Sequence, residues 1–472
     1  MRRRGSLLAA LVAAAALART RPADGAGIYF SDRGVRPMGR AGAFVAGADD
    51  LGAIWYNPAG LADAGTSILS DAAWLRFSSD YTRELRIVDA DNTVKTVTSP
   101  TVHGSSPVIP IPTIAASLVL DPEKRWTLAG GIFAPYPAIV TYPTTVAGQP
   151  SPARYALGSY DGSLLAVTGV FASYKPIEQL RIGAGVQALI GFYQTNVVFS
   201  VSPQDRLLGA PEQPEFDAQS SIRVGPIFAP SANAGAIYVP DPRIRFGVSV
   251  QAPTIISAST KLKVRLPSDA AFDGATINGQ DMHVRFELPA VFRIGVEGRF
   301  LPDLRVEVAY VREFWTTHHS IDATNENVTI DGVTGAPPSV RVPNITFPRS
   351  FDNSNSYRLG GEYRFKLWDY TWDARAGVAY ETSAVPVPYV SLLSLDMDKV
   401  IGTLGGSIHV GEHWRFDMVW AHFFASSVYV SPDVAQIPRV NPLKGNAPLE
   451  AVNGGTYHAS ADLIGFGLNY TF

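Results

Sequence analysis

Apolar and polar residues alternate with a period of two along most of this chain. In the C-terminal segment, Ile464, Phe466 and Leu468 alternate with small or polar residues. The same alternation, with charged residues on the second face, recurs at 243–251, 292–300, 357–366 and 372–381. One such strand would also suit a soluble sandwich. Many of them, each with an aromatic face and a charged face, predict a transmembrane β-barrel with a lipid-facing exterior and a polar interior.

Short turns alternate with long polar loops between these strands. The predicted turns lie at 121–124, 175–179, 240–243, 301–304, 368–370 and 411–413. The predicted loops lie at 89–106, 138–160, 200–227, 266–284, 320–355, 384–399 and 431–456. These connections predict an all-β fold, an antiparallel transmembrane barrel of about 14 strands with both chain ends on the short-turn, periplasmic side.

The first residues predict the compartment. Arg2, Arg3 and Arg4 precede an apolar stretch from Leu7 to Leu17, and small residues follow, so 1–25 is expected to be a secretory signal peptide. That stretch is shorter than the roughly 20 apolar residues of a spanning helix. The absence of Cys excludes a disulfide framework, a Zn-thiolate site and a Cys nucleophile. A net charge of -3 argues against a nucleic-acid partner.

The segment after the signal peptide does not alternate like a strand. Residues 39–65 read GRAGAFVAGADDLGAIWYNPAGLADAG, and this stretch resembles the N-terminal region of the FadL family of outer-membrane transporters for hydrophobic compounds. The family pattern here is a Gly-Arg-Ala-x-x-G segment, an acidic pair and an Asn-Pro-Ala turn. The residues assigned to this region are Gly39, Arg40, Gly42, Asp49, Asp50, Asn57, Pro58, Ala59 and Gly60. Weaker matches such as 233–253 and 288–300 extend the resemblance over nearly the whole mature chain.

The resemblance implies a partly helical N-terminal hatch at 26–65 inside a barrel formed by 66–472. The residues suit that place, because Asn57 can cap a helix, Pro58 fits a first helical position and Gly60 can take a conformation closed to other residues. It also implies a bacterial outer-membrane location and passive transport without a cofactor or metal. We expect a monomer surrounded by outer-membrane lipid, with the terminal aromatic residue Phe472 read by the barrel assembly machinery.

A route through the wall is also implied by the resemblance, at an inward kink in the third strand. That strand is 125–142 here. Pro residues cannot donate ladder hydrogen bonds, and Gly residues permit a bend. The predicted gate residues are Gly130, Gly131, Ala134, Pro135, Tyr136 and Pro137. In the alternative interpretation, Pro135 already belongs to the outer loop.

The substrate is left open between a long-chain fatty acid and an uncharged hydrocarbon or aromatic compound. Family members that carry fatty acids place a basic residue near the outer end of the fifth strand, where this chain has Phe192-Tyr193-Gln194. Arg154, Arg223 and Arg312 are possible substitutes. The loops at 200–227 and 266–284 are expected to form an apolar groove. Candidate substrate-binding residues are Phe192, Tyr193, Leu207, Leu208, Phe216, Ala271 and Phe272.

Three other functions compete with transport of hydrophobic compounds. A barrel enzyme would need an oriented base, but His318, His319, His409 and His413 are expected to be solvated loop or interface residues. A general porin for small hydrophilic solutes conflicts with a hatch that fills the lumen. A surface adhesin or structural barrel would bind no apolar ligand.

Overall fold

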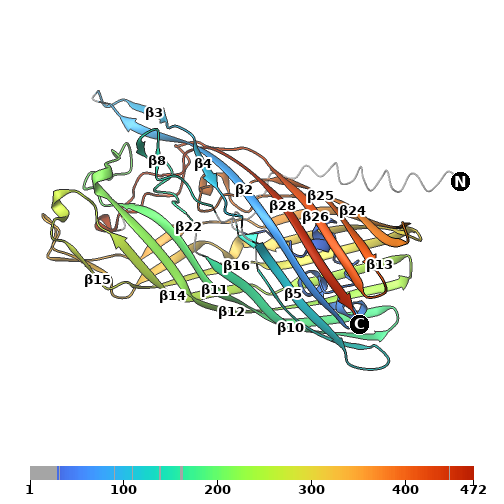
Figure 1. The fold of residues 1–472 in the computed structure, drawn as a ribbon. Coiled ribbons are helices and arrows are strands. Elements are labelled where there is room, and N and C mark those ends of the chain that lie inside the picture. The colour runs from blue at the N-terminus through green and yellow to red at the C-terminus, as the bar shows by residue number, and fades with distance from the viewer. Residues whose placement is uncertain are drawn as a thin grey trace.

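The chain forms a closed antiparallel β-barrel (Figure 1). The computed structural model describes residues 29, 30 and 32–472, apart from 90, 109, 135, 138, 139, 160–162 and 446. Within these residues the wall has 14 strands, which confirms the fold class predicted from the alternation. The predicted signal peptide, 1–25, lies outside the described residues.

Several wall strands consist of two consecutive elements separated by a short break. In chain order the wall is β2 (Ser67–Val88), β5 (Pro110–Val119), β6 (Trp126–Phe133), β10 (Leu164–Ile177), β11 (Leu180–Ser200), β12 (Asp217–Asp241), β13 (Ile244–Gln251) with β14 (Thr254–Arg265), β16 (Asp281–Leu288) with β17 (Ala290–Leu301), β18 (Leu304–Phe314) with β19 (Ser320–Asn325), β22 (Ile345–Pro348) with β23 (Ser354–Leu367), β24 (Tyr370–Glu381), β25 (Lys399–Val410), β26 (Trp414–Ala425) with β27 (Val428–Val430), and β28 (Gly455–Thr471).

The remaining elements are short. Outside the main wall are β1 (Tyr29–Phe30), β3 (Val94–Thr98), β4 (Val102–Ser105), β7 (Tyr136–Pro137), β8 (Thr145–Val146), β9 (Gln149–Pro150), β15 (Thr276–Asn278), β20 (Thr329–Asp331) and β21 (Ser339–Arg341). The helices are α2 (Val35–Met38), α3 (Ala53–Tyr56), η1 (Pro58–Asp63), η2 (Pro214–Phe216), η3 (Ala270–Phe272), η4 (Trp315–Thr317), η5 (Val387–Tyr389) and η6 (Pro442–Lys444). Among the described residues, no helix is long and apolar enough to cross a membrane.

The first and last wall strands close the barrel. β2 pairs with β28 from Ser67 opposite Thr471 to Arg83 opposite Gly455. The short turns lie at the barrel end that carries the C-terminus, and the long loops lie at the opposite end (Figure 1). We call these the turn end and the loop end.

Several predicted loops are shorter than the sequence suggested. The loop predicted at 266–284 ends at 280, because β16 begins at Asp281 and pairs with β14. The loop predicted at 200–227 ends at 216, because β12 begins at Asp217 and pairs with β11 from its first residue. Within the loop predicted at 320–355, β19 and β22 extend the wall and pair with each other. These corrections have the same cause: a strand that continues beyond the membrane is polar on its outer face, and in sequence it resembles a loop.

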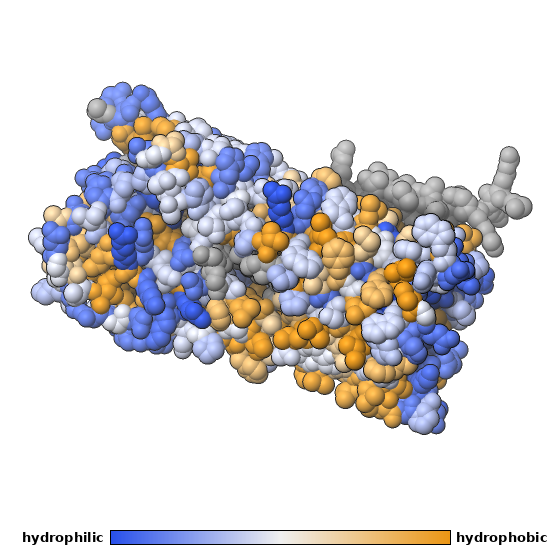
Figure 2. All heavy atoms as spheres, in the orientation of Figure 1, coloured by the Kyte–Doolittle hydropathy of each residue, from blue (hydrophilic) through white to orange (hydrophobic). Residues whose placement is uncertain are grey.

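The outer face carries the aromatic and aliphatic residues of the alternating pattern. Val186, Phe228 and Phe300 are 67%, 74% and 65% exposed. Figure 2 shows hydrophobic side chains over the middle and the turn-end half of the wall, with hydrophilic side chains gathered toward the ends. This is the distribution expected of a barrel whose outer face meets lipid.

Candidate functional site

The N-terminal segment, defined here as residues 32–66, lies inside the turn-end half of the barrel (Figure 1). Its side chains are almost fully buried; Arg40 and Phe44 are both 0% exposed, and Tyr56 is 1% exposed. The charged inward residues of the wall, such as Arg293, are buried against it. The charged face of the strands therefore meets this segment.

The acidic pair Asp49 and Asp50 joins the segment to itself and to the wall. Arg36 Nη1 lies 2.5 Å from Asp49 Oδ1 and 2.9 Å from Asp50 Oδ2. From the wall, Arg305 Nη1 lies 2.6 Å from Asp49 Oδ2, and Arg415 Nη2 lies 2.7 Å from Asp50 Oδ2. Ion pairs buried in this way fix register and position, because each charge left alone would lack compensation.

Glu307 of β18 holds the middle of the segment. Its carboxylate accepts backbone N–H bonds from Val45, Ala46 and Gly47 at 2.7, 3.0 and 2.8 Å. Its Oε2 also lies 3.4 Å from Arg40 Nη2, which lies 2.6 Å from Glu297 Oε2. One wall carboxylate thus satisfies three amides that no helix or strand ladder would satisfy.

The Asn-Pro-Ala-Gly turn has the predicted local structure. Asn57 caps η1, its side chain accepting a 3.2 Å hydrogen bond from the Ala59 amide, and Pro58 is the first residue of that helix. Gly60 does not have the backbone conformation closed to other residues that was predicted for it. Gly60 is not among the residues with positive φ; a Cβ there would lie 2.4 Å from the Ala48 carbonyl oxygen, so close packing requires glycine.

Two other predicted glycines also allow close contact with the wall. Gly42 has φ +69°, and a Cβ on it would overlap the side chains of Asp32 and Arg358. A Cβ on Gly39 would lie 3.3 Å from Gly405 Cα of β25. The Gly- and Ala-rich composition of the N-terminal segment therefore reflects backbone packing against strands.

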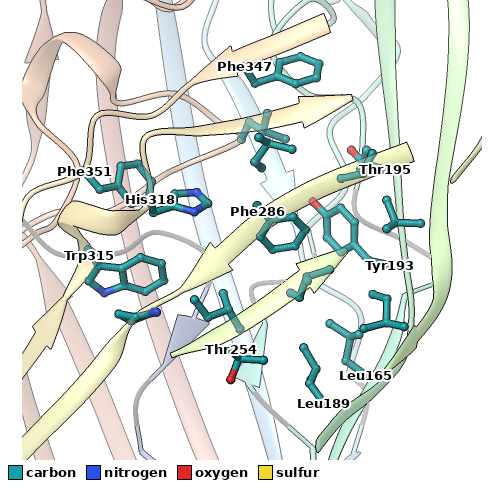
Figure 3. Close-up of a pocket in the computed structure, with 18 of the residues that line it drawn as sticks. Leu165, Leu189, Tyr193, Thr195, Thr254, Phe286, Trp315, His318, Phe347 and Phe351 are labelled. Atoms are coloured by element: carbon teal, nitrogen blue, oxygen red, sulfur yellow. The ribbon is translucent and has the colours of Figure 1, made fainter. Parts of the chain in front are cut away.

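An apolar cavity of about 160 Å³ lies beside this segment, toward the loop end. Trp55 of α3 lines it from the segment, and inward residues of seven neighbouring wall strands form most of the rest (Figure 3). Figure 3 shows Tyr193, Phe286 and Trp315 around the same space. The lining also includes Leu165, Val167, Leu189, Val224, Ile256, Val284, His318, Ile321, Ala323, Phe347 and Phe351.

The cavity is lined mainly by apolar side chains and a few uncharged polar groups. Among the described residues that line it, none is Asp, Glu, Lys or Arg. Its polar members are Gln187, Thr195, Ser231, Gln251, Thr254, His318 and the Tyr193 hydroxyl. Such a wall suits a ligand that needs few hydrogen bonds and no counter-ion.

The cavity exists because the alternation changes phase along the barrel. In the turn-end half, charged residues point inward and apolar residues outward, as at Arg293 and Ile294. In β16 the inward residues are Met282, Val284 and Phe286, and charged residues point outward. This reversal, visible in the sequence DMHVRFEL, was the signal that could have located the cavity.

The predicted substrate-binding residues separate into three groups. Tyr193 lines the cavity, whereas the ring of its neighbour Phe192 lies on the outer face beneath the Arg223 guanidinium, with Cζ 3.9 Å from the ring centroid. Phe216 and Phe272 contact each other edge to face, with ring centroids 6.5 Å apart. Leu207 and Leu208 are exposed in the 201–216 loop, and Ala271 packs beside the core at η3.

The three arginines considered as carboxylate partners do not line this cavity. Arg154 is held in the loops, with Nε 2.7 Å from Asp217 Oδ2. Arg223 stacks on Phe192, and Arg312 Nη1 donates a 3.0 Å hydrogen bond to Asn355 Oδ1. All three arginines therefore have contacts outside the cavity, and none of them faces a ligand bound in it.

The third wall strand leaves the barrel ladder after Phe133. β6 pairs with β5 and with β10 up to Phe133, and the Ala134 amide donates a 3.0 Å hydrogen bond to the Pro112 carbonyl. β7, Tyr136–Pro137, then pairs with β1, Phe30 opposite Tyr136 and Tyr29 opposite Pro137. Pro135 lies outside the described residues. The chain here runs against the N-terminal residues and not along the neighbouring wall strand.

Two predicted glycines precede this departure. A Cβ on Gly131 would lie 3.0 Å from Ile54 Cδ1 of the N-terminal segment, whereas the nearest atom to a Cβ on Gly130 would be the Gly169 carbonyl oxygen at 3.6 Å. Phe133 packs edge to face on Trp55, with ring centroids 5.1 Å apart. The end of β6 therefore adjoins the cavity floor.

The described ladder is interrupted beside this point. On one side of β2, pairing with β5 ends at Trp74 and pairing with β4 begins at Ser78. Across the interval the wall resumes through single bridges that join Ser105, Thr141, Ser159 and Asn196 in sequence. Within the described part of the chain, residues 75–77 have no ladder partner on this side of β2.

A comparison with protein families identifies the chain. The family described as outer membrane protein transport protein (OMPP1/FadL/TodX) matches residues 15–472. The chain belongs to this family. Its barrel is thus that of a bacterial outer-membrane transport protein that carries hydrophobic compounds, as the sequence resemblance predicted. No curated protein sequence matches the chain.

Solved structures of FadL-type proteins share the fold over almost their entire length. A Pseudomonas aeruginosa FadL homologue is 16% identical, with a TM-score of 0.68 over 95% of this chain and 100% of that one. The Ralstonia pickettii toluene transporter TbuX is 16% identical, with a TM-score of 0.58 and coverages of 93% and 98%. The P. putida toluene transporter TodX is 12% identical, with a TM-score of 0.59 and coverages of 95% and 99%.

Membership of the FadL family also settles the enzyme alternative, because the family and these neighbours are transporters. The histidines have other contacts. His409 Nε2 lies 2.8 Å from Asp373 Oδ2, and His413 Nδ1 lies 2.7 Å from the Thr471 carbonyl oxygen. Of the two places expected for His318, a solvated loop or an interface, the solvated one is excluded: its side chain is 4% exposed, its ring centroid lies 4.9 Å from that of Phe351, and it lines the cavity.

At the loop end of this FadL-type barrel, a buried ion cluster joins three loops to β2. Glu212 Oε1 lies 2.6 Å from Arg83 Nη1 and 3.4 Å from Arg439 Nη2, and Glu212 Oε2 lies 2.9 Å from Arg154 Nη1. Arg439 Nη1 also lies 2.9 Å from Asp205 Oδ1. The cluster connects the loops at 138–160, 201–216 and 431–454 on one side of the barrel mouth.

Acid is expected to loosen this loop cluster. Burial alone would raise the pKa of the Glu212 carboxyl, but Arg83, Arg154 and Arg439 outweigh burial and lower it to about 2 from 4.5. A carboxylate with a lowered folded-state pKa stabilises the fold fully above its unfolded pKa, and this stabilisation is lost as pH falls toward 2. It amounts to on the order of 3 kcal/mol. The protection factors of the backbone amides of 204–216, which compare the intrinsic exchange rate with the observed rate at the same pH, should therefore fall between pH 4.5 and 2 in the wild type. In Glu212→Gln they should be low already at pH 6.

Proposed function

We propose that this protein passively transports uncharged hydrophobic compounds, small aromatic hydrocarbons above all, and releases them sideways through its wall into the membrane. The N-terminal segment acts as a hatch that closes the direct aqueous path. What favours an uncharged solute is the cavity wall, whose described residues carry aromatic and aliphatic groups and no Asp, Glu, Lys or Arg.

A fatty-acid carboxylate would be poorly accommodated there. An ionised carboxylate that leaves water needs a cation or several hydrogen-bond donors, and without them the cost is several kcal/mol. Arg154, Arg223 and Arg312 are engaged outside the cavity. A neutral aromatic ring loses little on leaving water and can contact Phe286, Trp315 and other apolar side chains. Two solved structures with this fold are described as toluene transporters, which agrees with such a ligand.

The exit we propose lies where β6 leaves the wall. Trp55 belongs to the cavity lining and contacts Phe133, the last paired residue of β6. Leu165 and Val167 of β10 line the cavity and lie just beside that end. A solute that moves between these apolar groups would reach lipid through the ladder interruption without crossing the charged region around Arg36. No energy source is needed, because the solute moves down its own gradient.

A general porin is disfavoured by the N-terminal segment. Arg36, Arg40, Asp49 and Asp50 tie it to inward charges on several strands, and its side chains are almost all buried. A small hydrophilic solute would have to displace these ion pairs. Uptake of such a solute is therefore the outcome that would replace the transport proposal by a porin.

The experiment is uptake of radiolabelled toluene, a long-chain fatty acid and a small sugar by cells that lack their own uptake barrels and express this protein. We expect toluene to enter faster than in cells without it, and the fatty acid and the sugar to gain little. Faster uptake of the fatty acid than of toluene would contradict a neutral ligand. Uptake of the sugar alone would contradict the hatch.

Filling the cavity should reduce toluene uptake. Ala323 of β19 is 5% exposed and lines the cavity, so Ala323→Phe places a ring inside it. We expect an uptake rate lower by roughly 10-fold, in the range that one misfitting group produces in a hydrophobic pocket. Thr324→Phe, the neighbouring position on the exposed face of the same strand, is the matched control and should transport normally. Equal rates in both variants would place the route elsewhere.

A further inference from the structure

A patch of positive charge lies on the outer face of the wall near the loop end. Lys261, Lys263 and Arg265 occupy alternate positions of β14 and are exposed, and Arg223 of β12 faces the same side. Arg223 pairs directly with Lys261, Ser221 with Lys263 and Gln219 with Arg265. We call the four cations the basic patch. In Figure 2, strongly hydrophilic side chains lie over β14 at this end of the barrel.

Three of these cations lack a neighbouring carboxylate. Lys261 forms an ion pair with Asp281, and the outward Arg285 lies 3.7 Å from Glu287 Oε1. For Arg223, Lys263 and Arg265, no carboxylate of the described residues lies within 4 Å. The patch therefore keeps about three uncompensated positive charges after its own pairs are counted.

The patch lies just beyond the lipid-facing band. Along the same wall strand, the outward residues Phe246, Val248, Val250 and Ile255 are exposed and apolar. About ten residues of a tilted strand cover the roughly 25 Å apolar band of such a barrel. Ser257 and Ser259 follow, then Lys261, Lys263 and Arg265. On β11, which pairs with β12, the apolar face continues to Phe192, beneath Arg223 and therefore level with Lys261. Lys263 and Arg265 lie two and four residues beyond that edge, roughly 5 and 10 Å, at the height of the outer-leaflet headgroups.

A pocket of about 830 Å³ adjoins the patch. The 142–151 part of the loop bounds it on one side, and Lys263, Arg265, Gln219 and Ser221 bound it on the other. Arg154 and Asp217 also line it, and they are paired with each other at 2.7 Å. The pocket therefore combines uncompensated cations with hydroxyl and amide groups, which is the chemistry that holds a phosphorylated sugar.

We infer that the basic patch and this pocket bind the phosphorylated headgroup of an outer-leaflet lipid, with Lys263 and Arg265 as the principal phosphate-binding residues. The acyl chains of that lipid lie along the apolar face of β12 and β13. Arg223, whose guanidinium stacks on Phe192 at the upper edge of the apolar band, contacts the headgroup from below. The pocket and the transport cavity share one lining residue, Val197, but Lys263, Arg265 and Arg223 do not line the cavity, so failure of this inference would leave the transport proposal intact.

The test uses the purified full-length mature protein in detergent, titrated with bisphosphorylated lipid A, fully dephosphorylated lipid A and inorganic phosphate, with bound lipid counted by native mass spectrometry. Lys263→Gln with Arg265→Gln should bind the bisphosphorylated lipid roughly 30-fold more weakly, which corresponds to a loss of roughly fivefold for each cation near an anionic surface. Dephosphorylated lipid should bind weakly to both proteins. Both residues are exposed, so folding should not change, and heat-modifiable migration in gels checks this.

Lys124→Gln with Lys366→Gln is the matched control, because it removes two exposed lysines from the turn end. The control should bind like the wild type. Equal affinity of the patch variant and the wild type would overturn the inference, and so would an equal loss in the control, which would indicate net charge alone. If inorganic phosphate competes at the same concentration as the lipid, the ligand is a soluble phosphate and the lipid assignment is overturned.

Discussion

Replacing Pro135 and Pro137 together by Val is expected to lower toluene uptake to the level of cells without the protein. Proline has no amide to donate to a ladder, whereas Val supplies one and favours strands. With Val at both positions, the chain after Phe133 can continue along β10 instead of running to β1. The interruption of the ladder would close, and the solute would lose its exit.

The measurement is the initial rate of radiolabelled toluene uptake at equal amounts of folded barrel, checked by heat-modifiable migration. Pro337→Val with Pro338→Val is the matched control, since it makes the same chemical change in an exposed loop. It should transport at the wild-type rate. If the Pro135 and Pro137 variant also transports normally, solutes leave by another path and the lateral exit is wrong.

Glu307→Ala is expected to release the middle of the N-terminal segment. The change removes the acceptor of three backbone amides and one of the two carboxylates near Arg40, in a site that is 0% exposed. Loss of one partner from a buried ionic network costs about 3 to 5 kcal/mol. The exchange rates of the backbone amides of 39–47 should rise by the factor that corresponds to this loss of free energy. The exchange rates of the wall strands should stay unchanged.

The same variant provides a test of the hatch. If the N-terminal segment closes the aqueous path, Glu307→Ala should admit a small sugar and raise single-channel conductance in planar bilayers. Glu307→Gln should show a smaller effect, because an amide oxygen still accepts N–H bonds but carries no charge. Glu412→Ala, in the exposed turn before β26, should behave like the wild type. Faster exchange with no leak would mean that the segment does not seal the barrel.

The outer surface was predictable because it follows a local rule. Side chains of a strand alternate faces wherever the strand lies, so Ile294 and Leu359 could be assigned outward from their neighbours alone. They are 44% and 47% exposed. The turns were predictable for a similar reason, since Pro, Gly and Asp determine the local backbone within four residues.

The cavity could not be predicted in the same way. Its lining combines Trp55, Tyr193, Phe286 and Trp315, which are far apart in the sequence and meet only when the barrel closes. The start of β16 was interpreted as part of the 266–284 loop because its outward residues are polar or charged, and so the inward apolar residues Met282 and Val284 were missed. The alternation of apolar and polar residues can be seen locally. Whether the apolar residues face outward or inward depends on the height of the strand in the barrel.

The partners of individual charges were beyond sequence as well. Arg154 was a candidate for a ligand carboxylate, yet Glu212 and Asp217 hold it in the loops. His318 was expected in a solvated loop or at an interface, and the structure buries it against Phe351. The contacts of such a charged group or ring are made with residues from several loops that are distant in the sequence, so the sequence alone does not identify them.

By itself, the sequence determined that this chain is a 14-stranded outer-membrane barrel with a different, compact N-terminal segment, because strand periodicity, turn chemistry and a contiguous motif are all encoded within short stretches. Only the tertiary structure decided which inward faces meet charge and which enclose an apolar cavity. It also decided that the segment after Phe133 pairs with β1. Those properties arise from contacts between residues that are tens to hundreds of positions apart, and no local pattern specifies them.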